Sequence, residues 1–167
     1  MLKNKEELKD ILVEIEKMFP NAGCELVYHN VFELLIAVML SAQTTDKSVN
    51  IVTPALFKKY PNAKQLANAD ILEVKESIKR IGLYSNKSKN IIAASKVLVE
   101  KYNGEVPCDL IKLMELPGVG RKTANVVLSE GFKIPRIAVD THVERVSKRL
   151  GISNYDDSVL DVEMRLM

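Results

Sequence analysis

A chain of 167 residues, 47% hydrophobic and 5% aromatic with a formal net charge of +2, fits one domain or two small ones with an aliphatic, helix-packed core rather than a β-sandwich. Cys24 and Cys108 stand far apart, which excludes a disulfide scaffold and a clustered-cysteine metal site and indicates a reducing cytoplasm. The start of the chain is polar and its longest apolar run, residues 34–40, is shorter than a membrane span, so neither a signal peptide nor a membrane segment is expected.

Two helices with different patterns are predicted in the first quarter of the chain. Residues 5–18 carry an apolar stripe at helical spacing, and Asn4 with Glu7 can form a capping box before it. Residues 31–42 are apolar almost all round apart from Glu33. The first pattern predicts an amphipathic helix that needs an apolar partner, and the second predicts a central, buried helix.

A polar loop, residues 41–46, follows the buried helix, and Thr45 or Asp46 can cap the helix after it. Gln43 is the notable side chain in this loop. As a loop amide it can simply bond the nearby backbone. Further helices are predicted by the same periodicity at residues 46–60, 63–68, 71–81 and 86–102.

A basic stretch covers residues 75–96, with six basic residues against one acid. It contains the turn Ile81-Gly-Leu-Tyr84, with Ser85 as a candidate cap and Lys87 and Lys89 just beyond. Two interpretations stay open for this turn. It can bind a phosphate, or it can be a plain connector with solvated lysines.

The stretch Leu116-Pro-Gly-Val-Gly-Arg-Lys-Thr-Ala-Asn-Val-Val-Leu128 is predicted to form helix, tight turn, helix. Asp109 can cap the first helix and Pro117 ends it. Gly118 and Gly120 permit backbone angles that are closed to other residues and a close approach to the turn. Backbone amides at the start of the second helix, residues 121–130, can bind phosphate, although an ordinary αα-corner has the same pattern.

Lys122 lies one turn from that phosphate-binding end. Helical geometry places Ala124, Val127 and Leu128 on the apolar side of the second helix and Lys122, Asn125 and Ser129 opposite. A lysine at this place is either a solvated surface residue or a cation or amine beside DNA.

Asp140 follows a short extended link, residues 134–139, and begins a helix that runs to about Leu150. Either Asp140 is the cap of that helix, or Thr141 and Glu144 form a capping box and leave Asp140 unused. Both readings place a carboxylate at a helix start. A last helix is predicted to begin at Asp156 or Asp157.

Five separated motifs together resemble the endonuclease III family of DNA glycosylases, over roughly residues 5–152. The motifs are Leu116–Leu128, Val139-Asp-Thr-His-Val-Glu-Arg-Val146, Leu40-Ser-Ala-Gln-Thr-Thr-Asp46, Ile81–Tyr84 with Lys87, and Gly104-Glu-Val-Pro107. The resemblance implies an all-α, helix-hairpin-helix glycosylase fold. Residues 24–136 would form a six-helix bundle, and residues 1–23 and 137–167 would begin a second, discontinuous lobe.

The resemblance also implies roles for individual residues. Lys122 would form a Schiff base with the sugar of an oxidised pyrimidine nucleoside and cleave the strand by β-elimination, with Asp140 facing it across a cleft. Gln43 would fill the space of the extruded base. The other DNA contacts that it implies are Thr44, Leu83, Lys87, Pro117, Gly118, Val119, Gly120, Arg121 and His142.

Other classes of function stay open beside this bifunctional base-excision-repair enzyme. One is a monofunctional or mismatch thymine glycosylase, and another is a non-catalytic helix-hairpin-helix DNA-binding module. The expected partner is double-stranded DNA with a damaged base, and the expected location is the cytoplasm, at the nucleoid. A monomer is expected, with self-association through the second lobe as an alternative.

Cofactors are the point at which the chain departs from the family. Endonuclease III proteins usually carry a 4Fe-4S cluster on four cysteines, and those cysteines are absent here, so no cluster is expected and the chain is read as a fragment. No metal site is predicted. A monovalent cation held by carbonyls of the hairpin is the one ion that the resemblance leaves open.

Overall fold

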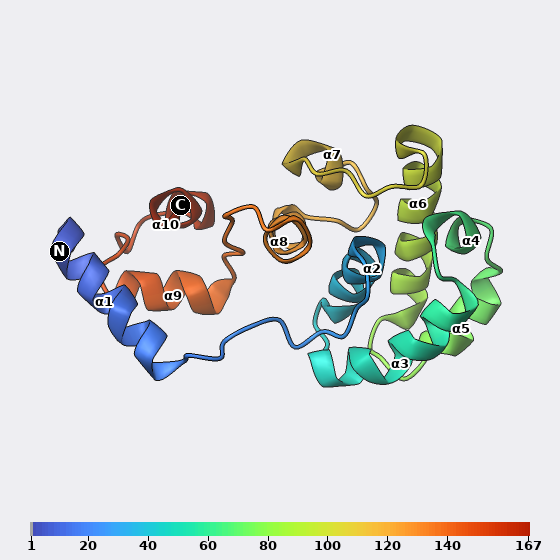
Figure 1. The fold of residues 1–167 in the computed structure, drawn as a ribbon, viewed down its shortest axis with the longest axis horizontal. Helices are drawn as coiled ribbons and strands as arrows, with labels where there is room; N and C mark the ends of the chain where they lie inside the picture. Colours follow the sequence, from blue (N-terminus) through green and yellow to red (C-terminus); the bar gives the residue numbers. More distant parts are fainter. Residues whose placement is uncertain (1) are drawn as a thin grey trace. The chain divides into compact units, whose positions relative to one another are not determined.

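The computed structural model describes residues 2–167, which contain helices and no strand (Figure 1). The chain divides into two compact units. Glu25–Ile134 forms the bundle unit, and Met1–Cys24 together with Pro135–Met167 forms the terminal unit. The predicted all-α architecture is confirmed for the described residues.

The bundle unit is built around one buried helix. Its helices are α2 (Val31–Ser41), α3 (Asp46–Lys59), α4 (Ala63–Ala67), α5 (Ile71–Ile78), α6 (Tyr84–Tyr102), α7 (Leu110–Met114) and α8 (Arg121–Val126), followed by a π-helical turn, η1 (Val127–Gly131). Every residue of α2 from Phe32 to Leu40 is buried, and the helix packs against α3, α6, α8 and η1. The predicted central helix is therefore the core of this unit.

Glu33 is the one charged residue in that buried run. Its Oε2 accepts hydrogen bonds from the backbone N–H of His29 and from His29 Nδ1, both at 2.8 Å. Asn30 caps the helix by accepting from the Glu33 N–H. The carboxylate is thus part of the structure that begins α2, which explains its burial among apolar residues.

The helix that starts at Arg121 differs from its prediction in two ways. It is not a continuous α-helix to about residue 130, because it changes to π-helical bonding at Val127, and Gly131 lies inside that turn rather than beyond the helix. Asn125 was predicted to lie opposite the apolar side of the helix, but it is fully buried and its side-chain amide has no hydrogen-bond partner. Since α7 and α2 both pack against α8, the helix is covered on more than one face.

The predicted cap of α6 was also wrong. Ser85 does not cap the helix, which begins directly after Leu83. Leu83 has a left-handed backbone (φ 57°) and makes no side-chain cap. The turn before α6 is therefore set by backbone geometry and not by a hydroxyl.

The terminal unit contains α1 (Lys5–Met18), α9 (Thr141–Arg149) and α10 (Val159–Leu166). Asn4 and Glu7 form the predicted capping box of α1. No residue of α1 is buried, and Leu12, Met18 and the following Phe19 are exposed. The N-terminal helix thus keeps much of its apolar stripe outside any core in the described structure.

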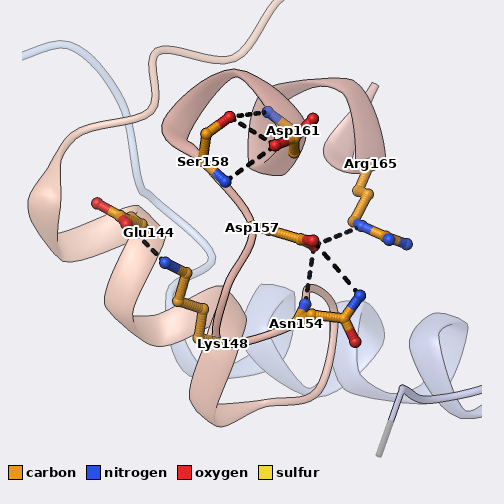
Figure 2. A network of polar contacts seen from close by, with 7 residues as sticks. All are labelled: Glu144, Lys148, Asn154, Asp157, Ser158, Asp161 and Arg165. Carbon is orange, nitrogen blue, oxygen red and sulfur yellow. Dashed lines mark hydrogen bonds and ion pairs between the residues drawn. The ribbon is translucent and has the colours of Figure 1, made fainter.

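Polar contacts lie within α9 and connect α10 to the loop before it (Figure 2). Asp157 accepts hydrogen bonds from the Asn154 backbone at 2.8 Å and from Arg165 Nε at 2.6 Å. Asp157 lies before α10, which begins at Val159, two or three residues later than predicted, with a capping box between Ser158 and Asp161. The predicted start at Asp156 or Asp157 was therefore wrong.

Candidate active site

The hairpin turn between α7 and α8 has the predicted shape. Asp109 caps α7, and the Val119 N–H bonds to the Leu116 carbonyl at 3.0 Å to close the turn. Gly118 has a left-handed backbone (φ 80°), and a Cβ there would lie 2.8 Å from the Cβ of Asn90. Glycine is therefore required at this position both by its backbone angle and by the neighbouring α6.

Gly120 differs from the prediction made for it. Its backbone is extended (φ −93°, ψ 176°), an angle that other residues adopt freely, and a Cβ there would meet nothing within 4 Å. Gly120 is the N-cap of α8 and offers no side-chain acceptor to the amides that begin the helix. The open space beside it is what allows another molecule to approach these amides.

The remaining hairpin residues differ in exposure. Pro117 and Arg121 are half-buried, and Lys122 is exposed. Val119 is buried, so its side chain belongs to the core and only its backbone can contact DNA.

Lys122 borders a cavity of about 230 Å³ in the bundle unit. The cavity is lined by Leu26, Val38, Ser41, Ala42, Gln43, Asp46, Lys122, Thr123 and Val126. The structure thus brings together two predicted residues that are far apart in the sequence, Lys122 from the start of α8 and Gln43 from the loop after α2. It also mixes apolar walls with a lysine, an amide and a carboxyl group.

Asp46 is the site residue that sequence reasoning missed. The pattern around it indicated only a candidate helix cap, and the cap is in fact Thr45. Burial raises the pKa of the Asp46 carboxyl, the carboxylate of Glu25 raises that pKa further, and the ammonium of Lys122 lowers it. An acidic group therefore shares this cavity with the candidate nucleophile, and no local signal in the sequence announces the pair.

The Gln43 loop is a tight turn at the end of α2. Gln43 is exposed and has a left-handed backbone (φ 54°). The turn is closed by a hydrogen bond of 3.0 Å from the Thr44 N–H to the Ser41 carbonyl. An exposed side chain on an uncommon backbone angle is a feature of functional loops, which agrees with the role predicted for Gln43.

Lys87 is not solvated, so the interpretation of this turn as a connector with solvated lysines does not apply to it. It is 6% exposed, and its Nζ donates a hydrogen bond to Thr44 Oγ1 at 2.6 Å. Burial lowers the pKa of its ammonium. Leu83, at the start of the same helix, is 56% exposed, so the turn before α6 presents an apolar side chain while Lys87 lies inside.

Asp140 lies in the terminal unit and is the N-cap of α9. Its Oδ1 accepts hydrogen bonds from the backbone N–H groups of His142 and Val143, both at 2.9 Å. The alternative capping box of Thr141 and Glu144 was wrong, because Glu144 pairs instead with Lys148 at 2.7 Å (Figure 2). His142 Nδ1 lies 3.6 Å from the second Asp140 oxygen, so the two predicted residues are neighbours.

No metal centre is found in the part of the chain from residue 2 to residue 167, where no group of three or more histidine, cysteine or acidic residues could hold an ion. A 4Fe-4S cluster needs four thiolates and the sequence has two cysteines, so the residues of this chain do not fit that cluster. Within the same residues, no helix is both long and apolar enough to cross a membrane.

Comparison with known proteins identifies relatives over nearly the whole chain. Residues 36–167 match the model of the HhH-GPD superfamily of base excision DNA repair proteins. Endonuclease III of Bacillus subtilis is 56% identical over 98% of this chain and 75% of its own length. Endonuclease III of Escherichia coli is 48% identical over 87% of this chain and 69% of its own length.

Solved structures show the same relationship. A trapped covalent intermediate of endonuclease III with DNA, in an estranged-adenine complex, has a TM-score of 0.93 and 57% identity, over 99% of this chain and 78% of that one. A non-covalent endonuclease III–DNA complex matches to the same degree. A thermostable thymine-DNA glycosylase, with a TM-score of 0.81 and 22% identity, shares the fold.

Proposed function

Because this chain belongs to the endonuclease III family, and is thus a DNA glycosylase of base excision repair, we propose that it removes oxidised pyrimidines and then cleaves the strand. The proposed partner is double-stranded DNA that contains a damaged base, and the proposed location is the cytoplasm. The observation that carries the proposal is the position of Lys122 beside a partly polar cavity at the start of α8, in a chain that is 57% identical to a protein trapped covalently on DNA.

The proposed reaction begins with attack of the neutral Lys122 amine on C1′ of the extruded nucleoside. The bond from C1′ to the base breaks, the base leaves with the bonding electrons, and it takes up a proton. The amine loses a proton, the C1′–O4′ bond breaks and O4′ takes up a proton, so the sugar ring opens to a Schiff base between C1′ and Lys122. Loss of a proton from C2′ then expels the 3′ phosphate, which cleaves the strand by β-elimination.

Asp140 is proposed to stabilise the positive charge that develops on the sugar, or to assist proton removal. Two backbone N–H groups donate to its Oδ1, and these hydrogen bonds fix the direction of the carboxyl group. A charge that is oriented before substrate arrives needs no reorganisation during the reaction.

The protonation state of Lys122 is a requirement of this mechanism. Only the neutral amine has the lone pair that attacks C1′. Exclusion of water from a lysine disfavours its charged form, so bound DNA that closes over the site supports the reactive form.

The hairpin is proposed to bind the DNA backbone rather than the base. Amides at the start of α8, beside the open space at Gly120, would hold a phosphate, and such contacts position a protein without reading sequence. Carbonyl oxygens of the same turn are suitable donors for a monovalent cation, and the proposal includes this ion.

Borohydride trapping tests the proposed chemistry, because it reduces a Schiff base to a stable protein–DNA adduct. We expect the chain to form an adduct on duplex DNA with an abasic or oxidised-pyrimidine site. Lys122→Gln should abolish it, and Lys64→Gln, a change of an exposed lysine in α4, should leave it unchanged. An adduct of undiminished yield in Lys122→Gln would remove Lys122 from this role.

A further inference from the structure

Lys87 is a buried lysine that the proposed chemistry does not use. Lysine is rarely buried unless it has a partner, because removing an ammonium from water is costly. Here the partner is the Thr44 hydroxyl, 2.6 Å from Lys87 Nζ and 43 positions away in the sequence. Charge-assisted hydrogen bonds are stronger than neutral ones, so this contact is a firm link between α6 and the loop after α2.

The contact braces the turn that carries Gln43. Thr44 Oγ1 accepts from Lys87 and donates to the Ala42 carbonyl at 3.5 Å, a long hydrogen bond. Ala42 and Thr44 are the two neighbours of Gln43, which has a left-handed backbone (φ 54°). Because L-residues other than glycine adopt this angle at an energetic cost, the surrounding bonds must hold Gln43 in place.

The backbone of Lys87 is bonded to a second loop. Its N–H donates to the Leu83 carbonyl at 3.0 Å, which closes the first turn of α6. Leu83 also has a left-handed backbone (φ 57°) and presents an exposed apolar side chain. The side chain of Lys87 therefore bonds to the Gln43 turn from a position in the first turn of α6, directly after Leu83.

We infer that Lys87 is a positioning residue that holds Gln43 and Leu83 in a fixed arrangement, so that both side chains meet the DNA duplex together. This inference rests on the proposed function, together with the DNA contacts that the family resemblance implies for Gln43 and Leu83. It differs from the direct phosphate contact expected for Lys87 from the sequence, since the ammonium is buried and already bonded to Thr44. The two roles lead to different measurements.

A double-mutant cycle tests the link itself. Lys87→Met removes the charge and keeps much of the side-chain length, and Thr44→Val removes the hydroxyl with little change of shape. Misplacement of a group that positions substrate can lower a rate by about 10²-fold, so we expect each change to lower base excision from duplex DNA by about 10-fold to 10²-fold. The double variant should lose no more than the worse single variant, because both remove one contact. Lys96→Met, an exposed change on α6, is the control and should be unaffected.

Two further readouts separate positioning from general damage and from phosphate binding. The fluorescence of 2-aminopurine opposite a non-cleavable abasic analogue should change on binding of the wild-type chain and much less with either variant, because Gln43 no longer occupies the space consistently. Loss of a phosphate contact would reduce the slope of log affinity against log salt by about one, and we expect that slope to stay unchanged. Borohydride trapping on single-stranded abasic DNA, which has no opposite base, should also be unchanged.

Several outcomes would overturn the inference. They are additive losses in the double variant, a reduced salt slope in Lys87→Met, or equal loss of trapping on single-stranded DNA. If Lys87→Met does not fold, Thr44→Val alone decides by its fluorescence change. If the proposed function is wrong, the wild-type chain itself should form no borohydride adduct on single-stranded abasic DNA. The fluorescence and salt measurements do not depend on catalysis, so they test the role of Lys87 separately.

Discussion

The two units stabilise their candidate catalytic residues in different ways. The bundle unit has a continuous buried helix, α2, against which the helix of Lys122 packs. In the terminal unit, no residue of α1 and only Ser147 of α9 is buried. Among the described residues of this unit, the buried apolar side chains are those of Val139 and Val162. Asp140 itself accepts bonds from the backbone at the start of α9, and other caps and ion pairs of the unit are drawn in Figure 2. Lys122 is thus carried by a helix with extensive apolar packing, whereas Asp140 is held mainly by local polar bonds.

Hydrogen exchange should show the largest difference between the units. Amides of α2 should exchange only by global unfolding, which costs about 5–15 kcal/mol in typical domains, whereas amides of α1 should exchange by local opening. In a demonstrated monomer we expect protection in α2 to exceed that in α1 by about 10³-fold or more. Equal protection of residues 6–18 and residues 31–42 would contradict the difference in stability between the units and show that the terminal unit is stable by itself.

Asp140→Asn tests whether the polar bonds of the terminal unit can be separated from its charge. Asparagine caps a helix about as well as aspartate, so the free energy of unfolding should change by less than about 1 kcal/mol. Base excision should fall by about 10²-fold to 10⁴-fold, the range of a positioned acid or base. Circular dichroism and single-turnover excision measure the two effects. A large loss of stability with normal turnover per folded molecule would instead assign Asp140 a structural role.

The two hairpin glycines of the bundle unit should differ in how strongly they affect stability. Gly118→Ala places a Cβ against Asn90 and forces a left-handed alanine, which should destabilise the chain by about 1–3 kcal/mol in urea unfolding. Gly120→Ala should cost about 1 kcal/mol or less, because its backbone is extended and its Cβ position is open.

Binding measurements on the same variants test the phosphate role. Gly120→Ala should weaken binding to damaged and undamaged duplex DNA equally, since phosphate contacts carry no sequence information. Loss confined to damaged DNA would mean that the turn belongs to the lesion pocket. Removal of monovalent cations, with ionic strength kept constant, should weaken both kinds of duplex in the same way if the turn holds such an ion.

The smallest effect concerns two carboxyl groups whose pKa values shift in opposite directions. Burial raises the pKa of Asp46 in the bundle unit above 3.8, so its ionised form is costly at neutral pH and the cost disappears as pH falls through the folded-state pKa. The backbone N–H of Asn154, with Arg165, lowers the pKa of Asp157 in the terminal unit. Its contribution is therefore present above the unfolded-state pKa and is lost as pH falls through the folded-state value.

Substitution by asparagine measures both shifts in one experiment. At pH 7, Asp46→Asn should raise the free energy of unfolding slightly and Asp157→Asn should lower it. Both differences should shrink as pH is lowered toward 3.5 in urea unfolding followed by NMR. Differences of the same sign would contradict the assignment of burial to one group and hydrogen bonding to the other.

Local patterns in the sequence predicted the parts of the structure that local physics decides. The apolar run of α2, the capping box at Asn4 and the cap of α7 at Asp109 each depend on neighbours within a few residues. The hairpin turn belongs to the same class, and its left-handed Gly118 was predicted correctly.

The π-helical turn at Val127–Gly131 could not be predicted in this way, because it depends on contacts with another helix. A Cβ at Gly131 would lie 3.1 Å from side-chain atoms of Val31 and Leu34, so η1 packs closely on α2. The burial of Asn125 has the same cause, since α8 is covered by α2 and α7. Helical periodicity alone cannot show that a helix is covered on two faces.

The candidate site was predictable only in part for a related reason. Lys122 and Gln43 were singled out from motifs, and the structure places both on one cavity. Asp46 lines that cavity because Lys122, from a distant segment, lies on its other side. Lys87 is buried because it contacts Thr44, which is 43 positions away in the sequence. Those long-range contacts leave no periodic signal in the sequence.

The capping geometry of Asp140 has a consequence for how this position can change during evolution. The fold accepts a short side chain with an acceptor oxygen at the start of α9, and asparagine, serine and threonine meet that demand. The proposed chemistry requires a negatively charged side chain at this position. Glutamate also carries that charge, but it is not a preferred helix cap. Aspartate is the one amino acid in both sets. If the proposed chemistry holds, a substitution that spares the helix, such as asparagine, removes the charge, so position 140 has no substitution that preserves both the helix cap and the charge.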